Sequence, residues 1–375
     1  MTHRTPAEVF PPGEYLRDEI GERGWSQTEF AEIIGRPMRV VNEIIAGKVQ
    51  ITPKTATEIA AALGTSPQYW MNLETAYQLG KVEAPPERIA REARLREKFP
   101  VKEMIKRGWV LHSNNFEVME SRVLTFFNAS NLDAPILFDH AARRNHGEDL
   151  SSIQLAWLFR ARQIVSALRV PKFSESALRA ALAELDLLMA EPDEARHVPR
   201  ILAECGVRFA IVEPVPGSKI QGVCFWINEG KSPVIALSMK IDRIDNFWFN
   251  LRHEIEHVLR GDGKSAAIVD EDPYDLTNCS DPEAEKAANA AAADFCVPAS
   301  RMDNFIARHD PIFTTVNFLG FSKIVRRHPG IVAGQLHHKL NGRHELFAKY
   351  IAKVRDVITQ TALTDGYGKS CPVDP

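Results

Sequence analysis

The chain has 375 residues, more than one hydrophobic core normally holds, so two or three domains are expected. Its composition, 45% hydrophobic and 25% charged residues, is typical of a globular protein, and a net charge of −3 excludes coating of nucleic acid by overall positive charge. No apolar run reaches the roughly 18 residues that span a bilayer, and the five cysteines are scattered, so reduced thiols, no membrane partner and a cytoplasmic location are predicted.

Short helical patterns with sharp stops fill the N-terminal part of the chain. Ser26 is followed three residues later by Glu29, which is the spacing of a capping box. Gly35 then ends the helix that this box begins. An all-α domain is therefore predicted over residues 1–80, with helices at 13–23, 27–34, 37–46, 52–63 and 66–79.

The second and third of these helices have the spacing of a helix-turn-helix, with the third as the DNA-reading helix. Arginine can pair with guanine or phosphate, and asparagine can pair with adenine through two hydrogen bonds. The partner predicted here is operator DNA, and the alternative is a helical domain that binds protein. The candidate DNA contacts are Gln27, Arg36, Arg39, Asn42 and Lys48.

Pro85-Pro86 marks the boundary to a middle region, 85–205, in which every pattern is helical. This region carries no recognisable chemistry, and a scaffold or dimerisation role is predicted for it. The helices are expected at 87–107, 116–127, 151–168, 175–190 and 195–205.

The pattern changes after residue 206. Three apolar runs, rich in Val, Ile, Phe and Trp and separated by turn residues, predict strands at 207–212, 222–227 and 233–237. Strands followed by a group of helices indicate an α+β domain over 206–345. Residues 364–375 are expected to be disordered. The predicted helices of this domain lie at 243–260, 281–296, 299–308, 313–326 and 330–340.

The strongest chemical signal is the sequence His253-Glu254-Ile255-Glu256-His257, inside an amphipathic helix. Residues four apart share one helix face, so both imidazoles can bind one metal ion, and Zn²⁺ is the predicted cofactor. Glu254 lies about 100° around the helix from His253, where it can act as general base without binding the metal. The alternative is a helix with two surface histidines and a salt-bridging glutamate.

Catalytic zinc sites take three protein ligands and keep one position open. Glu285, on a following alanine-rich helix that can pack closely, is the candidate third ligand, and Glu283 is the competing choice. Such a metal activates water and polarises a peptide carbonyl. A strand at 233–237 is a candidate for binding extended substrate by strand addition. One of four downstream histidines could stabilise the oxyanion, although each is expected on the surface: His309, His328, His337 and His338.

Residues 205–300 resemble the ImmA/IrrE family of metallopeptidases, in which a small strand layer precedes an HExxH helix and a later helix carries E-x-x-A-N…P. Glu285, Ala288-Asn289 and Pro298 match this second motif. The resemblance implies a zincin-like, gluzincin-type endopeptidase with His253, His257 and Glu285 as ligands. Two positions depart from the family pattern: Glu256 replaces a glycine, and Ala291-Ala292 replaces Phe-Ala.

Residues 12–80 resemble HigA-type antitoxins of the Xre class. The matching segments are 26–31, 41–48, 51–52 and 62–73. The resemblance implies a homodimer on a palindromic operator.

Two functional hypotheses follow. In the first, the protein is a zinc endopeptidase that cleaves a protein partner, a repressor or a toxin, while its N-terminal domain binds operator DNA. In the second, it is a repressor or antitoxin of a toxin-antitoxin system whose zinc domain only senses or binds a partner. Glu254 favours the first hypothesis, since a binding module has no need of a general base.

Overall fold

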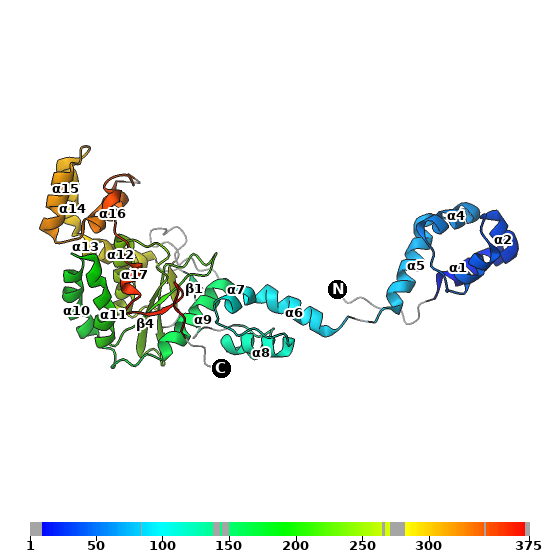
Figure 1. Cartoon of the computed structure of the whole chain (residues 1–375), viewed down its shortest axis with the longest axis horizontal. Coiled ribbons are helices and arrows are strands. Elements are labelled where there is room, and N and C mark those ends of the chain that lie inside the picture. The colour runs from blue at the N-terminus through cyan, green and yellow to red at the C-terminus, as the bar shows by residue number, and fades with distance from the viewer. Residues whose placement is uncertain are drawn as a thin grey trace. The chain divides into compact units, whose positions relative to one another are not determined.

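The computed structural model describes residues 10–83, 85–136, 138, 143–144, 150–264, 267–270, 282–340 and 343–371. The chain divides into two compact units, Met1–Ile89 and Ala90–Pro375 (Figure 1). Of the five cysteines, four are free thiols and Cys279 lies outside the described residues. No helix in the described ranges has the length and apolar character to cross a membrane.

The N-terminal unit is all-α, as predicted. Its helices enclose a core of buried apolar side chains that includes Leu16, Phe30 and Trp70. The predicted capping box is present: the Ser26 hydroxyl accepts from the Glu29 amide at 3.2 Å, and the Glu29 carboxylate accepts from the Ser26 amide at 2.7 Å. The helices are α1 (Pro12–Glu22), α2 (Gln27–Ile33), α3 (Met38–Ile45), α4 (Pro53–Leu63) and α5 (Pro67–Lys81).

The C-terminal unit combines helices with one mixed sheet. Its strands are β1 (Arg143–Arg144), β2 (Arg208–Val212), β3 (Gly222–Ile227), β4 (Ser232–Leu237), β5 (Ile268–Asp270) and β6 (Leu363–Asp365). Its α-helices are α6 (Glu87–Lys98), which begins in the N-terminal unit, α7 (Val101–Lys106), α8 (Phe116–Phe126), α9 (Ser152–Ser166), α10 (Glu175–Leu188), α11 (Val198–Glu204), α12 (Ile244–Arg260), α13 (Pro282–Cys296), α14 (Ala299–His309), α15 (Thr315–Val325), α16 (Pro329–Lys339) and α17 (Arg355–Ile358), with 3₁₀ turns at Pro192–His197 and Ala348–Tyr350.

The strands are ordered β1-β5-β3-β4-β2-β6. β3 runs antiparallel to both β4 and β5, whereas β2 runs parallel to β4 and β6. β4 therefore has a hydrogen-bonded strand on each side: Val234 pairs with Phe225 of β3 and with Arg208 of β2. Strand addition at 233–237 is excluded, because neither edge of β4 is free.

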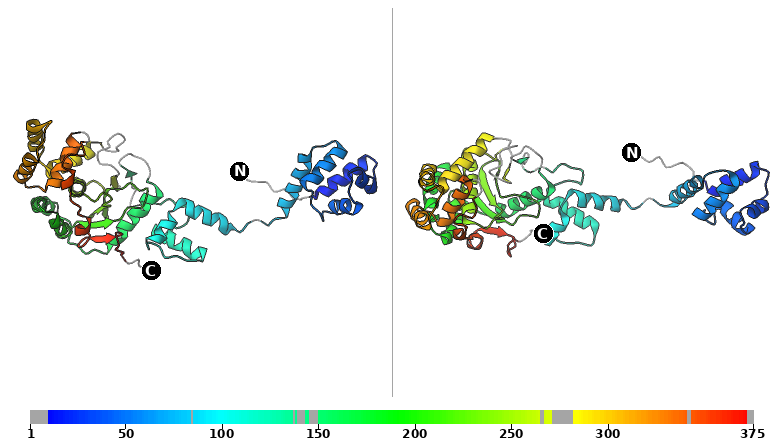
Figure 2. Two further views of the ribbon diagram at one scale, coloured as in Figure 1. Left: turned by 45° about the horizontal axis from the view of Figure 1, so that its top comes forward. Right: turned by 90° about the horizontal axis from the view of Figure 1, so that it is seen from above.

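Helices cover both faces of this sheet (Figure 2). Alternate residues of each strand enter different cores, as the two-residue period of a strand requires. Phe209, Cys224 and Ile235 face the core formed with α10 to α16, whereas Ala210 and Phe225 face the core formed with α6 to α9. Residues 85–205 and 206–345 therefore do not form separate compact units, since the middle helices complete the two cores of the sheet.

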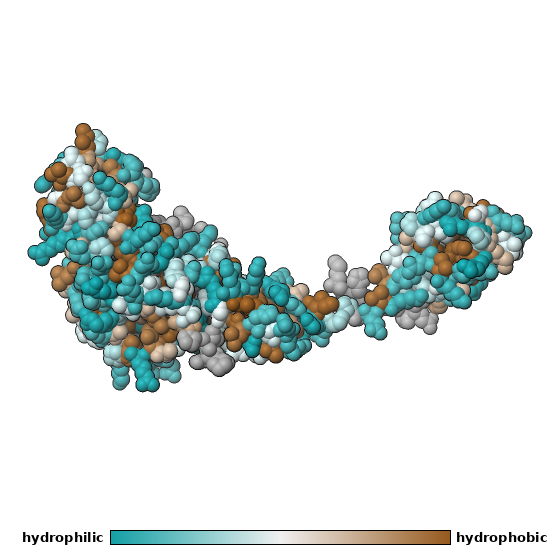
Figure 3. Space-filling view, viewed as in Figure 1, coloured by the Kyte–Doolittle hydropathy of each residue, from teal (hydrophilic) through white to brown (hydrophobic). Residues whose placement is uncertain are grey.

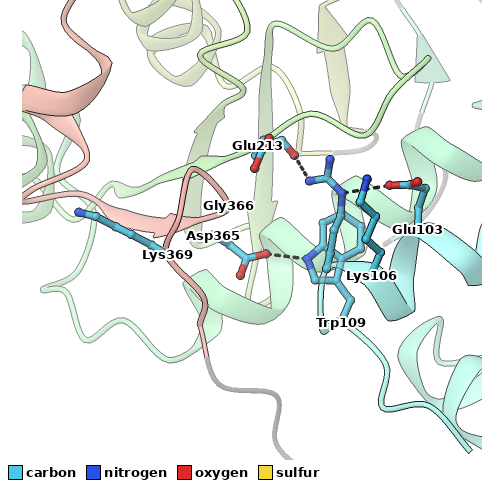
Figure 4. A pocket seen from close by; sticks show the side chains of 8 residues that line it. Glu103, Lys106, Trp109, Glu213, Asp365, Gly366 and Lys369 are labelled. Atoms are coloured by element: carbon cyan, nitrogen blue, oxygen red, sulfur yellow. Dashed lines mark hydrogen bonds and ion pairs between the residues drawn. The ribbon is translucent and has the colours of Figure 1, made fainter.

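The C-terminal segment is part of the fold, so the predicted disorder of residues 364–375 is wrong for 364–371. Residues 372–375 lie outside the described part. β6 extends the sheet, and the Asp365 carboxylate accepts a hydrogen bond from the Trp109 indole at 2.6 Å (Figure 4). Arg160 on α9 donates to the same carboxylate with two nitrogens, each at 3.0 Å. A buried ion pair thus anchors the end of the chain.

Hydrophobic residues also gather on the surface at the α14–α15 end of this unit (Figure 3). Ile312, Val316 and Ile324 are each more than two-thirds exposed there. Their spacing places Val316 and Ile324 on the outer face of α15.

Candidate metal centre

The HExxH sequence lies in the second half of α12, a helix buried on nearly all sides. Apolar side chains such as Phe247, Leu251 and Ile255 enter the core between this helix and the sheet. Gly261, in the left-handed conformation at φ 77°, ends the helix directly after Arg260. The burial of α12 holds both histidines of the motif rigidly, and His253 and His257 are 1% and 0% exposed.

Three side chains converge between α12 and α13. The Nε2 atoms of His253 and His257 are 3.0 Å apart. His253 Nε2 lies 3.3 Å from Oε2 of Glu285, and His257 Nε2 lies 3.3 Å from Oε1 of the same carboxylate. Among the described residues these three form the one group able to hold a metal ion. Glu285 is buried, whereas Glu283 is exposed on the same helix. Buried Ala288 and Ala292 let α13 lie close to α12, which brings the short carboxylate within reach.

Hydrogen bonds from behind orient both imidazoles. His253 Nδ1 lies 3.0 Å from Asn289 Oδ1, and His257 Nδ1 lies 3.1 Å from Asp262 Oδ2. Because these oxygens accept, each Nδ1 carries the proton, and both Nε2 lone pairs face each other and a carboxylate. These four electron-rich atoms, two nitrogens and two oxygens, repel one another unless a cation lies between them.

The spacing of the donor atoms fits zinc. Ligand bonds of about 2.0–2.1 Å in tetrahedral geometry place ligand atoms about 3.3 Å apart. The separations of 3.0 and 3.3 Å agree with this value. A set of two imidazoles and one carboxylate is also a donor set that catalytic zinc sites use.

Glu254 lies beside this group and 1% exposed, with its side chain turned towards β3. A Cβ atom on Gly222 would clash with Oε1 of Glu254, so a larger residue at this position would require the carboxylate to move. Glu254, next to His253 in the sequence, is thus not one of the three converging side chains.

Glu256, which departs from the family pattern, accepts a hydrogen bond from Arg252 at 2.7 Å. Both side chains are mostly buried, and the Arg252 guanidinium lies over the Phe295 ring. The extra acidic group is therefore paired one turn away along α12, and its charge is compensated.

Sequence reasoning missed the roles of Asp262 and Asn289. Burial alone would raise the pKa of Asp262, but its hydrogen bonds with His257 and Arg260 and the charge of Arg260 outweigh burial, so the pKa lies below its ordinary value. The signal for Asp262 was an acid immediately after a helix-ending glycine. Asn289 belonged to a recognised motif, but its place behind His253 depends on tertiary packing.

The four downstream histidines lie in different places. His309 is bonded to Asn317 on the exposed α14–α15 pair. His328 caps α16 through the Gly330 amide, and its half-burial lowers its pKa. His337 and His338 line a cavity beside α12.

The predicted DNA-contact residues are unequally exposed in the N-terminal unit. Arg39 is highly exposed, with its Nε 3.4 Å from Glu43, and Lys48 is exposed as well. Arg36 donates instead to Glu58 on α4 at 2.7 Å, which offsets its charge and lowers the pKa of Glu58. Gln27 and Asn42 are only partly exposed.

Two family models match the chain. Residues 16–70 match the helix-turn-helix family, and residues 208–341 match the peptidase family described as the IrrE N-terminal-like domain.

Similar proteins cover the N-terminal unit. An uncharacterised HTH-type transcriptional regulator, YddM of Escherichia coli, is 31% identical over 72 residues, which are 19% of this chain and 77% of that protein. Antitoxin HigA-1 of Vibrio cholerae is 37% identical over 79 residues, 21% of this chain and 71% of that protein. A solved structure of Pseudomonas aeruginosa antitoxin HigA with the higBA promoter is 27% identical, covering 24% of this chain and 96% of that one, with a TM-score of 0.19.

Both family matches agree with the described geometry. The helix-turn-helix match contains a turn at Gly35 between α2 and α3, and the peptidase match contains a small sheet and the buried HExxH helix. The chain therefore belongs to the Xre-like helix-turn-helix family that includes the HigA antitoxins, and its C-terminal unit contains an IrrE N-terminal-like domain of the ImmA/IrrE type.

Proposed function

We propose that the protein is a zinc-dependent endopeptidase that cleaves a protein partner and is coupled to operator DNA. The observation that carries the proposal is the convergence of His253, His257 and Glu285 at 3.0–3.3 Å in a buried site with Glu254 beside it. A sensing module would need the three ligands but would have no use for the fourth group.

The proposed reaction uses the chain's own residues as follows. His253, His257 and Glu285 hold Zn²⁺, which when bound supplies Lewis-acid chemistry at a water molecule and a peptide carbonyl. The Glu254 carboxylate takes a proton from the attacking water and delivers it to the leaving amine. Asn289 and Asp262 keep the two imidazoles in the tautomer that presents Nε2, and such supporting bonds typically change metal affinity by about 10–100-fold.

Metal content tests the ligand set. Wild-type protein purified with zinc present is expected to hold about one zinc per chain, and His253→Ala is expected to lose it because two ligands cannot complete the site. The measurement is inductively coupled plasma mass spectrometry after gel filtration. His309→Ala, which removes an imidazole from the exposed α14–α15 pair, serves as the matched control and keeps its zinc. A wild-type protein without zinc, or equal zinc in both variants, contradicts the proposal.

The second part of the proposal is that the N-terminal unit binds operator DNA. It is supported by the names of the similar proteins, a transcriptional regulator and an antitoxin, and by the exposure of Arg39 and Lys48. Met38 at the start of α3 is also exposed, so the beginning of the reading helix presents side chains to a ligand. By the same resemblance, a homodimer on a two-fold symmetric operator is proposed.

Arg39→Ala is expected to lower affinity for the preferred duplex about tenfold, since a base or phosphate contact of arginine contributes about 1–3 kcal/mol. The duplex is first obtained by selection from random sequences, and affinity is then measured by fluorescence anisotropy at fixed salt. Lys81→Ala, in the last turn of α5, is the control and should bind as wild type. Selection of no preferred sequence would argue against operator binding and leave the peptidase proposal standing.

A further inference from the structure

The turn that follows the HExxH helix carries Asp262, whose carboxylate lies 3.1 Å from His257 Nδ1. Asp262 stands between two glycines, Gly261 and Gly263, and both have the left-handed conformation at φ 77°. Glycine has more conformational freedom than any other residue, so the local sequence does not by itself hold Asp262 in place. The position of the carboxylate behind His257 therefore depends on what binds this turn from outside.

An arginine competes for the same carboxylate oxygen. Arg260 Nε lies 3.1 Å from Oδ2 of Asp262, the oxygen that also faces His257, and the Arg260 side chain is 38% exposed. Because the exposed arginine can follow a moving carboxylate and the buried imidazole cannot, an outward movement of the turn would leave the ion pair intact and break the contact with the imidazole. His257 thus keeps its partner only while the backbone of Asp262 is fixed.

Strand β3 supplies the fixed point. The Trp226 indole donates from Nε1 to the main-chain carbonyl oxygen of Asp262 at 2.7 Å, and the Cys224 thiol lies 3.8 Å from the same oxygen. The turn lies directly on the strand, because a Cβ atom on Gly263 would be 2.8 Å from the Cys224 carbonyl oxygen. The amide of Asp262 donates in turn to the His257 carbonyl at 2.9 Å. The peptide groups on both sides of Asp262 are thus bound, which fixes the direction in which its side chain leaves the backbone.

Trp226 is itself held rigidly. Its side chain is 5% exposed and belongs to the core formed with α10 to α16. The Phe173 ring packs edge-on against it with ring centroids 5.3 Å apart, and the Lys264 ammonium lies 4.6 Å from the centre of the indole. A buried indole N–H usually has a hydrogen-bond acceptor, and here the acceptor is the turn beside the metal centre.

The same face of β3 also contacts the proposed general base. Gly222, Cys224 and Trp226 are alternate residues of the strand, so their side chains point to one side of the sheet. Gly222 lies against the Glu254 carboxylate, and Trp226 reaches the turn that carries Asp262. One face of one strand therefore packs on both the base and the residue that supports a zinc ligand.

We infer that Trp226 is a positioning residue of the zinc site: through Asp262 it keeps the His257 imidazole in the orientation that binds the metal. The inference rests on the proposed peptidase function and adds to it a strand residue, outside the HExxH motif, that sets the affinity for zinc.

Trp226→Phe tests the inference, since it removes the indole N–H and keeps an aromatic ring in the core. Zinc affinity is expected to fall about threefold to tenfold, the effect of one hydrogen bond, in a competition between the full chain and a chelator of known affinity. Trp248→Phe is the matched control, because Trp248 is fully buried on α12 and its indole N–H has no hydrogen-bond partner among the described residues. This control loses the same ring volume and should keep the wild-type affinity.

Equal affinity in wild type and Trp226→Phe, or an equal loss in the two variants, would overturn the inference and leave the proposed function intact. A wild-type protein that binds no zinc would overturn both. Replacing the Trp226 indole by benzothiophene, which keeps the shape and lacks the N–H, repeats the test should the phenylalanine variant not fold.

Two further measurements separate positioning from a loss of packing. The absorption bands of the Co²⁺-loaded protein depend on the geometry of the ligands, so they should shift in Trp226→Phe and stay unchanged in Trp248→Phe. Asp262→Ala alone is expected to lower zinc affinity about 10–100-fold, and Trp226→Phe added to it should cause no further loss. Unshifted bands, or a further loss of the same size in the double variant, would mean that the indole does not act through Asp262.

Discussion

Replacing Glu254 with glutamine is expected to lower peptide hydrolysis by about 10²–10⁴-fold while the protein keeps its zinc, because a positioned general base contributes about this factor. Glutamine has nearly the same shape as glutamate and still fits against Gly222, so the packing of β3 on α12 is retained. What is lost is the carboxylate that accepts a proton from water. Activity and metal binding therefore separate in this variant.

The measurement is the initial rate on a peptide that the wild-type protein cleaves, found by mass spectrometry of a digested peptide library, with zinc content determined on the same sample. Glu256→Gln is the matched control, since it removes one negative charge from the same helix two residues away. Glu256 pairs with Arg252 and has no place in the proposed reaction, so its variant should retain most of the activity. Equal loss in both variants would indicate that charge on α12, and not proton transfer at Glu254, controls the rate.

The chemistry of the candidate site was largely readable from the sequence because it depends on helical spacing. Two histidines four residues apart must share a face of α12, whatever surrounds the helix. Asp262 was not readable in the same way, since it reaches His257 only because Gly261 turns the chain back in a left-handed conformation. Which residue hydrogen-bonds the second nitrogen of an imidazole depends on tertiary structure, and the local sequence pattern says little about it.

The strands of the sheet differ in the same way in how far the sequence predicts them. The strands β2, β3 and β4 were predicted because each is a buried apolar run of five or six residues. β6 is only three residues long, Leu-Thr-Asp, and it pairs through contacts such as Ala210 with Leu363, far apart in sequence. A run so short has no periodicity of its own, so residues 364–375 looked like a disordered tail. Pairing with β2 supplies the order that local propensity lacks.

Substitution of Asp365 by alanine is therefore expected to destabilise the C-terminal unit by about 3–5 kcal/mol, the usual cost of removing one partner of a buried ion pair. Arg160 and Asp365 are only 2% and 3% exposed, so the guanidinium would stay buried without its carboxylate. The Trp109 indole and the Cys371 amide would lose the same acceptor.

Differential scanning calorimetry of the full chain measures this effect as a lower midpoint temperature for the unfolding of the C-terminal unit. The N-terminal unit is expected to unfold in a transition of its own, and its midpoint should not change. Asp356→Ala, at an exposed site on α17, is the control and should change stability by no more than about 0.5 kcal/mol. An unchanged midpoint in Asp365→Ala would mean that β6 does not hold the helices to the sheet.

Ending the chain at residue 345, the predicted limit of the peptidase domain, removes the same carboxylate and the strand with it, so such a shortened protein should be at least as unstable.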